Sequence, residues 1–196
     1  MASASTTRLI IVAAAAAFGL GALIAVAAVS GSKLVSSPAA DARGSGALWT
    51  EVAWPFPADE WGRGRAFVCK AADCGAETAL YLRAKLGFCN CTTGVADDDE
   101  LERIGDLHLT GATPSAMAAG QTIQVAAMKG RMRAYTVSGA RSSKTSVLAI
   151  AFNDRCDVIV ATVLVGREHP TALEQPVMRF LNGPDVVRWA EVTLGL

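Results

Sequence analysis

The chain has 196 residues, 52% of them hydrophobic and 18% charged, and its formal net charge is zero. Soluble domains average about 25% charged residues, so this apolar composition indicates one domain of about 150 residues together with a leader or an anchor. Residues 1–43 hold three of the 18 basic residues and one of the 18 acidic residues, and the remaining 15 basic and 17 acidic residues exclude a global attraction to nucleic acid.

Residues 9–29 (LIIVAAAAAFGLGALIAVAAV) carry no charge. As a helix they would be about 31 Å long, which is close to the hydrocarbon thickness of a bilayer. Arg8 lies directly before them, which favours a cytoplasmic location for the N-terminal residues 1–8. We therefore expect a transmembrane anchor that inserts into the membrane through residues 9–29. The alternatives are a signal peptide, cleaved near the small residues 27–31, and a buried helix of a soluble domain.

Residues 30–46 are mainly small and polar and predict a flexible linker with a reach of about 20 Å. Residues 47–196 then form one folded domain, and its first half predicts strands. In residues 48–54, Leu48, Thr50, Val52 and Trp54 alternate with Trp49, Glu51 and Ala53. Residues 65–70 are a second, short candidate strand, and residues 78–88 have apolar side chains with a period of two.

The second half of the domain predicts a short helix over residues 98–107, with Asp99 and Glu102 at the spacing of a capping pair. A first hairpin pairs residues 122–128 with 131–138 around Lys129-Gly130. A second pairs 145–153 with 157–165, whose strands are apolar on both faces and therefore need cover on both sides of the sheet.

Helical cover comes from residues 173–181 and 186–190. Pro176 marks the first turn of the former helix, and Asn182-Gly183-Pro184 separates the two. Together these elements predict an α+β domain, in which a few helices cover an antiparallel sheet of five or six strands. One transmembrane or signal helix precedes this domain.

The order of these elements is loosely similar to that of PsbP-like domains, which are exported and act as accessory subunits or binding modules. The stretch Leu86-Gly87-Phe88-Cys89-Asn90-Cys91-Thr92-Thr93-Gly94 resembles a stretch in uncharacterised exported or membrane-anchored proteins of Gram-negative bacteria. This resemblance implies export and carries no activity with it.

The five cysteines are Cys69, Cys74, Cys89, Cys91 and Cys156. In an exported protein they predict disulfides. Cys69 and Cys74 can close a small loop, and Cys156, at a hairpin tip, can reach Cys89 or Cys91. On an extended strand Cys89 and Cys91 would share one face, which disfavours a bond between them. At least one cysteine stays unpaired in a monomer.

A metal site is the alternative use of the cysteine cluster. The thiolates of Cys69, Cys74, Cys89 and Cys91 could hold zinc tetrahedrally, although their spacing is not a common zinc pattern. A thioredoxin-like redox centre would need C-x-x-C, which this sequence lacks.

Two groups of side chains are candidate interaction surfaces. The first group is Trp49, Trp54 and Trp61. If these side chains are exposed, they would mark a partner site, a ligand groove or the membrane interface; if they are buried, they would cover one edge of the sheet. Arg131 and Arg133 share a face near a hairpin tip, where they would meet lipid headgroups or an anionic partner, or would belong to an ordinary solvated hairpin.

The remaining candidates favour structural roles. Residues 97–100 (DDDE) lack the EF-hand spacing for calcium and suit a helix N-terminus. His108 and His169, the two histidines, have no recognisable partners for a catalytic triad, and no cofactor motif is present.

We therefore expect a non-enzymatic, membrane-tethered binding or accessory domain in the periplasm, held together by disulfides. It would sit on the inner membrane with a single pass, or in the periplasm after signal cleavage, and a membrane-protein complex is its candidate partner. The alternative is a thiol-redox or metal-binding protein, and a hydrolase with an unrecognised site comes third.

Overall fold

The computed structural model describes residues 48–138, 145–166 and 170–196. The predicted anchor or signal segment and the linker lie outside these residues, as does His169. Of the helices in the described ranges, none is both long enough and apolar enough to cross a membrane.

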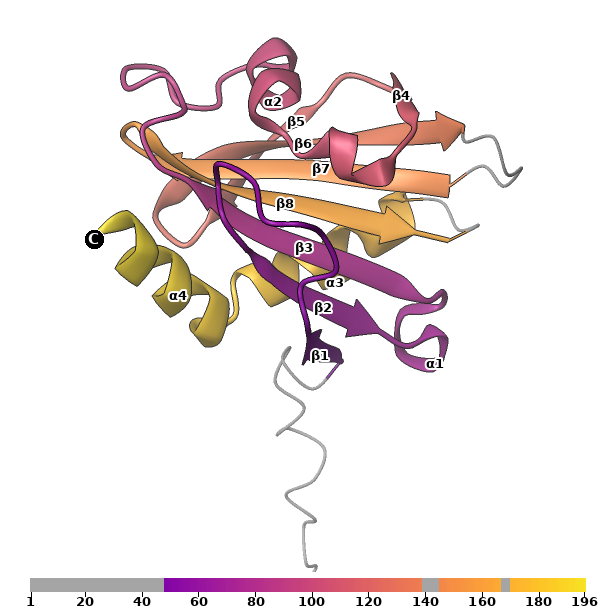
Figure 1. The fold of residues 1–196 in the computed structure, drawn as a ribbon. Helices are drawn as coiled ribbons and strands as arrows, with labels where there is room; N and C mark the ends of the chain where they lie inside the picture. The colour runs from indigo at the N-terminus through magenta and orange to yellow at the C-terminus, as the bar shows by residue number, and fades with distance from the viewer. Residues whose placement is uncertain (1–47, 139–144, 167–169) are drawn as a thin grey trace, which may run out of the picture. The chain divides into compact units, whose positions relative to one another are not determined.

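One antiparallel sheet of eight strands organises the domain (Figure 1). Its hydrogen-bonded order is β1-β2-β3-β8-β7-β6-β4, and β5 pairs with the other end of the same edge of β6. The strands are β1 (Trp49–Val52), β2 (Arg65–Cys69), β3 (Thr78–Lys85), β4 (Thr113–Ala116), β5 (Gln121–Val125), β6 (Met128–Ser138), β7 (Thr145–Asp154) and β8 (Asp157–Val165).

The α+β class is confirmed, but the sheet has eight strands instead of five or six. The strand that the pattern did not reveal is β4 (TPSA), an edge strand that contains Pro114 and is mostly exposed. It therefore has no alternation between buried and exposed positions that a sequence pattern could detect.

Helices cover both faces of the sheet, as the apolar hairpin β7–β8 requires. Leu148, Ile150 and Phe152 of β7 face a core completed by α3 (Thr171–Leu181) and α4 (Pro184–Leu194). The alternate residues Val147, Ala149 and Ala151 face a second core under α2 (Asp98–Ile104) and η1 (Leu107–Thr110). In Figure 1, α3 passes behind β3.

The β5–β6 hairpin differs from its prediction because its turn lies at Ala126-Ala127 and not at Lys129-Gly130. Ala126 takes the positive φ of 50° that the tight turn needs. Gly130 lies inside β6, where a Cβ atom would be only 2.1 Å from the carbonyl oxygen of Ala151. The glycine is thus required by the close approach of β7 and not by a turn.

The helix over residues 98–107 begins at Asp98 as predicted and ends earlier, at Ile104, but its cap and the first turn of α3 differ from their predictions. Asp97 is the cap of α2, and its side chain accepts a hydrogen bond from the backbone N–H of Glu100 at 2.8 Å, which replaces the expected Asp99–Glu102 pair. Pro176 lies inside α3 and not in its first turn, because that helix begins at Thr171. The predicted break before α4 is confirmed, with Pro184 as its first residue.

Two disulfides confirm the predicted use of the cysteines. The Cys69–Cys74 disulfide joins residues five positions apart and closes a small loop that contains the short helix α1 (Ala71–Cys74). The Cys91–Cys156 disulfide joins residues 65 positions apart. The expected shared strand face for Cys89 and Cys91 is wrong because β3 ends at Lys85 and the chain turns at Gly87, which has a φ of 67°. Cys89 is free and buried.

The two disulfides are expected to differ in their contribution to stability. The chain-entropy relation gives about 4 kcal/mol for the long loop and about 2 kcal/mol for the short one. The double variant Cys91→Ser/Cys156→Ser should therefore lose more free energy of unfolding than Cys69→Ser/Cys74→Ser. Urea titration of both variants and the parent chain measures this, and equal losses would contradict the assignment.

Candidate functional site

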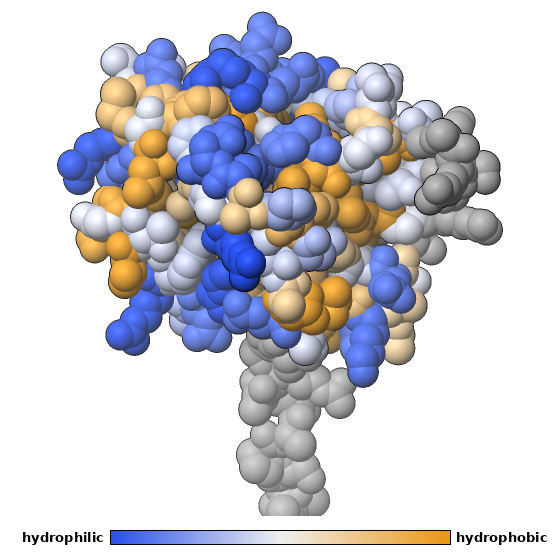
Figure 2. Space-filling model, viewed as in Figure 1, coloured by the Kyte–Doolittle hydropathy of each residue, from blue (hydrophilic) through white to orange (hydrophobic). Residues whose placement is uncertain are grey.

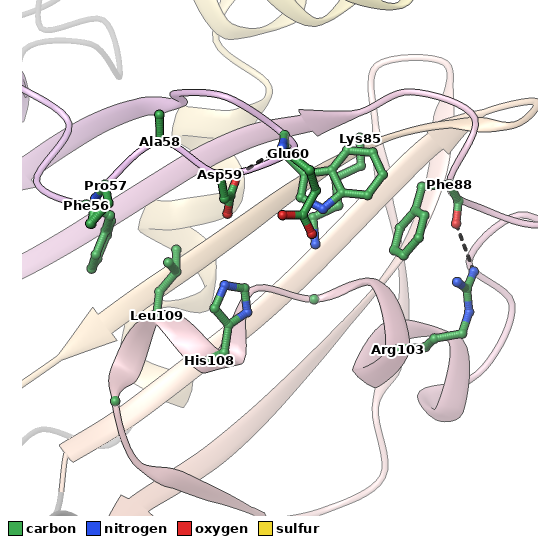
Figure 3. A pocket seen from close by; sticks show the side chains of 13 residues that line it. Phe56, Pro57, Ala58, Asp59, Glu60, Lys85, Phe88, Arg103, His108 and Leu109 are labelled. Carbon is green, nitrogen blue, oxygen red and sulfur yellow. Dashed lines mark hydrogen bonds between the residues drawn. The ribbon is translucent and has the colours of Figure 1, made fainter.

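A cleft of about 580 Å³ opens on the face of the sheet that carries α2 (Figure 3). One wall is segment 56–61, which precedes β2, and the opposite wall is formed by Gly105, His108, Leu109 and Gly111, at and after the end of α2. Lys85 lies on the floor, and Phe88 and Arg103 close one end. Three stretches far apart in the sequence therefore build the cleft.

Aromatic packing fixes the first wall on the sheet. Trp54 and Phe56 contact Tyr81 of β3, with ring centroids 5.9 and 4.8 Å away. Gly64 permits this close approach, because a Cβ atom there would be 2.7 Å from the Trp54 ring. A tight turn follows, in which the backbone N–H of Trp61 donates to the Asp59 carboxylate at 2.9 Å.

Four charged side chains beneath the cleft form what we call the ionic cluster: Asp59, Arg83, Lys85 and Asp106. Arg83, Lys85 and Asp106 are only 1%, 3% and 2% exposed. Arg83 donates to both oxygens of Asp106, through Nε at 2.9 Å and Nη2 at 2.6 Å, and its Nη1 donates to Asp59 at 2.7 Å. The cluster holds two cations and two carboxylates and is therefore formally neutral.

The ionic cluster joins both walls of the cleft to β3. Asp59 belongs to the first wall and Asp106 to the second, and Arg83 holds both. The hydrogen bond from Arg83 holds the pKa of the Asp59 carboxyl below its usual range, so this carboxyl stays ionised at neutral pH. The separation of the walls is thus set by charge-assisted hydrogen bonds, which are the strong ones in proteins.

Lys85 brings a cation to the cleft floor. Its ammonium donates to the carbonyl oxygen of Ile104 at 2.7 Å and lies 2.8 Å from Asp106 Oδ1. An ammonium has three N–H bonds, so these two acceptors leave one. The Lys85 nitrogen also lies 5.6 and 5.5 Å from the ring centroids of Trp61 and Phe88.

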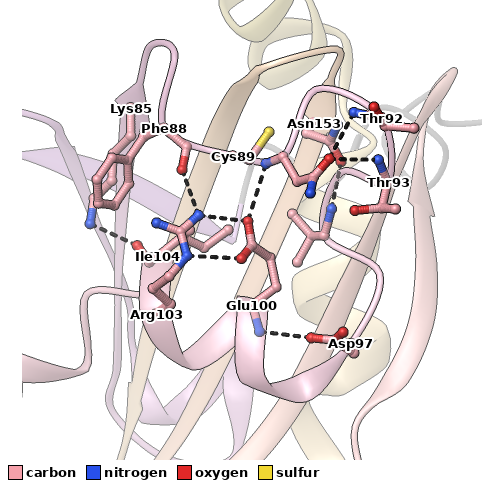
Figure 4. A network of polar contacts seen from close by, with 12 residues as sticks. Lys85, Phe88, Cys89, Thr92, Thr93, Asp97, Glu100, Arg103, Ile104 and Asn153 are labelled. Carbon is pink, nitrogen blue, oxygen red and sulfur yellow. Dashed lines mark hydrogen bonds and ion pairs between the residues drawn. The ribbon is translucent and has the colours of Figure 1, made fainter.

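The end of the cleft at Phe88 is held by the polar network in Figure 4. Arg103 donates to the Phe88 carbonyl at 2.8 Å and to Glu100 at 2.9 and 2.7 Å. Glu100 in turn accepts from the backbone N–H of Asn90 at 3.2 Å. The Cys91–Cys156 disulfide follows directly in the chain, so this loop is fixed by both covalent and polar links.

The three tryptophans of the predicted surface do not lie together. Trp49 is buried on the α3 and α4 face, where its ring lies 5.1 Å from that of Phe180. Trp54 packs under the first wall. Of the three, only Trp61 lines the cleft, and its ring lies 4.5 Å from that of Phe88 at a tilt of 53°.

Arg131 and Arg133 also differ from their prediction, because they lie within β6 and not at its hairpin tip. Arg131 pairs with Asp98 at 2.5 Å, and Arg133 pairs with Glu102 at 2.7 Å. These ion pairs hold α2 on the sheet, so the two arginines are engaged within the domain.

His108 is exposed and lines the cleft. Nothing in the sequence singled it out beyond its being one of two histidines. The acidic run 97–100 caps and begins α2, as its structural interpretation predicts.

The cysteine cluster does not form the alternative tetrathiolate site, because Cys69 and Cys91 are bonded to different partners. Within the described residues, no group of three His, Cys, Asp or Glu side chains is placed to hold a metal ion. Burial raises the pKa of the free Cys89 thiol to about 11, so the thiol stays protonated at neutral pH and is a poor nucleophile.

No family model matches this sequence, and no curated protein matches it. The chemistry of the cleft is that of aromatic walls, a buried cation and exposed polar groups.

The ionic cluster is expected to be sensitive to loss of Asp106. Asp106→Asn leaves two buried cations short of a carboxylate and should lower the free energy of unfolding by about 3–5 kcal/mol. Glu51→Gln is the matched control, because Glu51 is 50% exposed in its pair with Arg65, and should cost about 1 kcal/mol or less. Urea titration tests both, and a small effect of Asp106→Asn would contradict the structural role of the cluster.

Proposed function

We propose that this protein is a membrane-tethered binding domain outside the cytoplasm and that the cleft is its ligand site. The observation that carries the proposal is the cleft itself, whose two walls are fixed to β3 through Arg83. Ligand sites in proteins are mostly preformed hollows in which aromatic and apolar walls carry a few placed polar groups. The cleft has this composition, with Trp61 and Phe56 beside Lys85 and His108.

The location outside the cytoplasm is supported by the two disulfides. Disulfides persist in oxidising compartments and are rare in the cytosol. The uncharged residues 9–29 support a tether or a cleaved leader, and the resemblance to exported proteins of Gram-negative bacteria favours the periplasm. An accessory role in a membrane complex agrees with this position.

A binding role is better supported than thiol chemistry. A catalytic thiol is normally poised as a thiolate in an electropositive and accessible site. Cys89 is buried, and its thiol donates to the carbonyl oxygen of Arg155 at 3.2 Å. The other four cysteines are in disulfides, so the proposal assigns them to the stability of the domain.

Location and oxidation can be tested in one preparation. The full chain, produced in a Gram-negative host, should fractionate with the inner membrane. Its intact mass under non-reducing conditions should lie below the reduced mass by four hydrogen atoms, two for each disulfide. Retention of residues 1–29 identifies an anchor, and their loss identifies a cleaved leader. A cytosolic, fully reduced chain would overturn the proposal.

The cleft can be tested with a set of soluble fragments that includes neutral, anionic and cationic compounds. Ligand-observed NMR on the full chain in lipid nanodiscs should find binders whose signals are lost in Trp61→Ala. They should be retained in Trp61→Phe, which keeps an aromatic wall, and in Lys129→Gln, a change at an exposed position on β6 that does not line the cleft. Binders that are indifferent to Trp61→Ala would place the ligand site elsewhere.

A further inference from the structure

We propose that the domain docks onto the lipid bilayer of its own tether through an apolar patch formed by α4 and the end of β3. The patch consists of Leu86, Trp189, Val192 and Leu196, and we call it the docking patch. This inference rests on the membrane tether of the proposed function and is independent of the cleft. It adds which face of the domain contacts the lipid surface.

The docking patch holds three of the five large apolar side chains that the described residues expose. Leu86, Val192 and Leu196 are 56%, 73% and 52% exposed, and the other two are Val52 and Met117. Scattered apolar side chains are normal on a protein surface, whereas a group of them marks contact with a protein or a membrane. The concentration of these side chains at one place therefore predicts a contact surface.

The side chains of the docking patch are brought together by α4 and β3. Trp189 and Val192 are neighbours on the helix surface because they are three positions apart. Leu86, directly after β3, lines a hollow of about 430 Å³ together with Trp189 and Thr193. In Figure 2, hydrophobic residues lie among hydrophilic ones at the edge of the domain where Figure 1 places α4 and the C-terminus.

Helix α4 carries more apolar surface than its packing requires. Its inner side chains, Val186, Ala190 and Leu194, are buried in the core. Val192 lies two positions from Ala190, which is about 200° around the helix axis, so it points away from that core. The packing of the domain therefore gives no reason for an apolar residue at this position, and a contact outside the domain does.

The docking patch lies beside the strand at which the tether enters the domain. The linker leads into β1, whose Glu51 pairs with Arg65 at 2.6 Å. The Arg65 guanidinium in turn lies 5.8 Å from the centre of the Trp189 ring. Because the predicted linker reaches about 20 Å, the tether can bring this side of the domain to the bilayer.

The charged side chains at the border of the docking patch carry both signs. They are Arg63, Arg188, Glu60, Asp185 and Glu191, and all five are exposed. This mixture gives no strong attraction to anionic lipid, so we expect the apolar side chains to supply the binding energy. Tryptophan is enriched at membrane interfaces, and arginine side chains there extend toward the headgroups.

The tether makes a weak contact sufficient. A small apolar patch binds a bilayer only weakly from free solution. A short flexible linker raises the effective concentration of the attached surface to about the millimolar range. A second protein would have to diffuse to the docking patch, whereas the bilayer is always within reach, and this favours lipid as the occupant.

The test is the quenching of a fluorescent label by brominated phosphatidylcholine in nanodiscs that hold one copy of the full chain. An environment-sensitive label is attached to Val192→Cys or, as the matched control, to Lys129→Cys, an exposed position on β6. The parent chain controls for reaction at Cys89, which is buried. The label at position 192 should emit at shorter wavelength and lose most of its emission, and the label at position 129 should be unaffected.

Variants test the patch itself. Leu86→Glu places a charge at an exposed position of the docking patch and should abolish quenching of the label at position 192, with an unchanged melting temperature. Thr122→Glu, at an exposed position on β5, is the matched control and should leave the quenching intact. High salt should also leave it intact, because the contact is apolar.

The outcomes separate this inference from the proposed function. An unquenched label at position 192 in a chain that fractionates with the membrane overturns the docking alone, as does equal quenching at positions 192 and 129. A blue shift without quenching, seen only in nanodiscs with two copies, assigns the patch to a second copy and overturns the lipid. A chain that does not fractionate with the membrane overturns the tether and the docking together.

Discussion

Two buried cations on one strand are the constraint on which this face of the domain depends. Arg83 and Lys85 project from β3 toward the side that carries α2, where an unpaired charge would be strongly unfavourable. The segments on either side must therefore bring acceptors to β3. Asp59 comes from the segment before β2, and Asp106 and the Ile104 carbonyl come from the end of α2. The positions of both cleft walls follow from this requirement.

The two faces of the sheet are covered by different means. On one side, α3 and α4 have eleven residues each and bury mainly apolar side chains. On the other side, α2 has only seven residues, and ion pairs hold it at both ends, through Arg131 and Arg133 at its start and through the ionic cluster beyond its end. A helix this short covers part of the sheet, and the uncovered part beside it is the cleft.

The sequence predicts the elements of the domain better than it predicts the site. The β7–β8 hairpin and the C-terminal helices follow from long apolar runs and a proline–glycine break. The same period of two places Arg83 and Lys85 together on the polar face of their strand, which would ordinarily face solvent. The two acids that accept from Arg83 lie 24 and 23 residues away from it, and the carbonyl that accepts from Lys85 lies 19 residues away, all in segments without a pattern. Which acid meets which base depends on how those segments cross the sheet, and no local signal carries that information.

The free Cys89 places a requirement on how the chain acquires its long disulfide. Cys89 and Cys91 are only two residues apart, and the backbone N–H of Cys89 already donates to the carbonyl of Cys156 at 3.1 Å. In an unfolded chain, Cys89 and Cys91 therefore compete for Cys156 on nearly equal terms. Once the loop has docked, Cys89 is buried and only Cys91 stays exposed. Correct pairing is therefore selected when folding precedes oxidation, and oxidation that outpaces folding would generate an isomer that needs a disulfide isomerase to repair it.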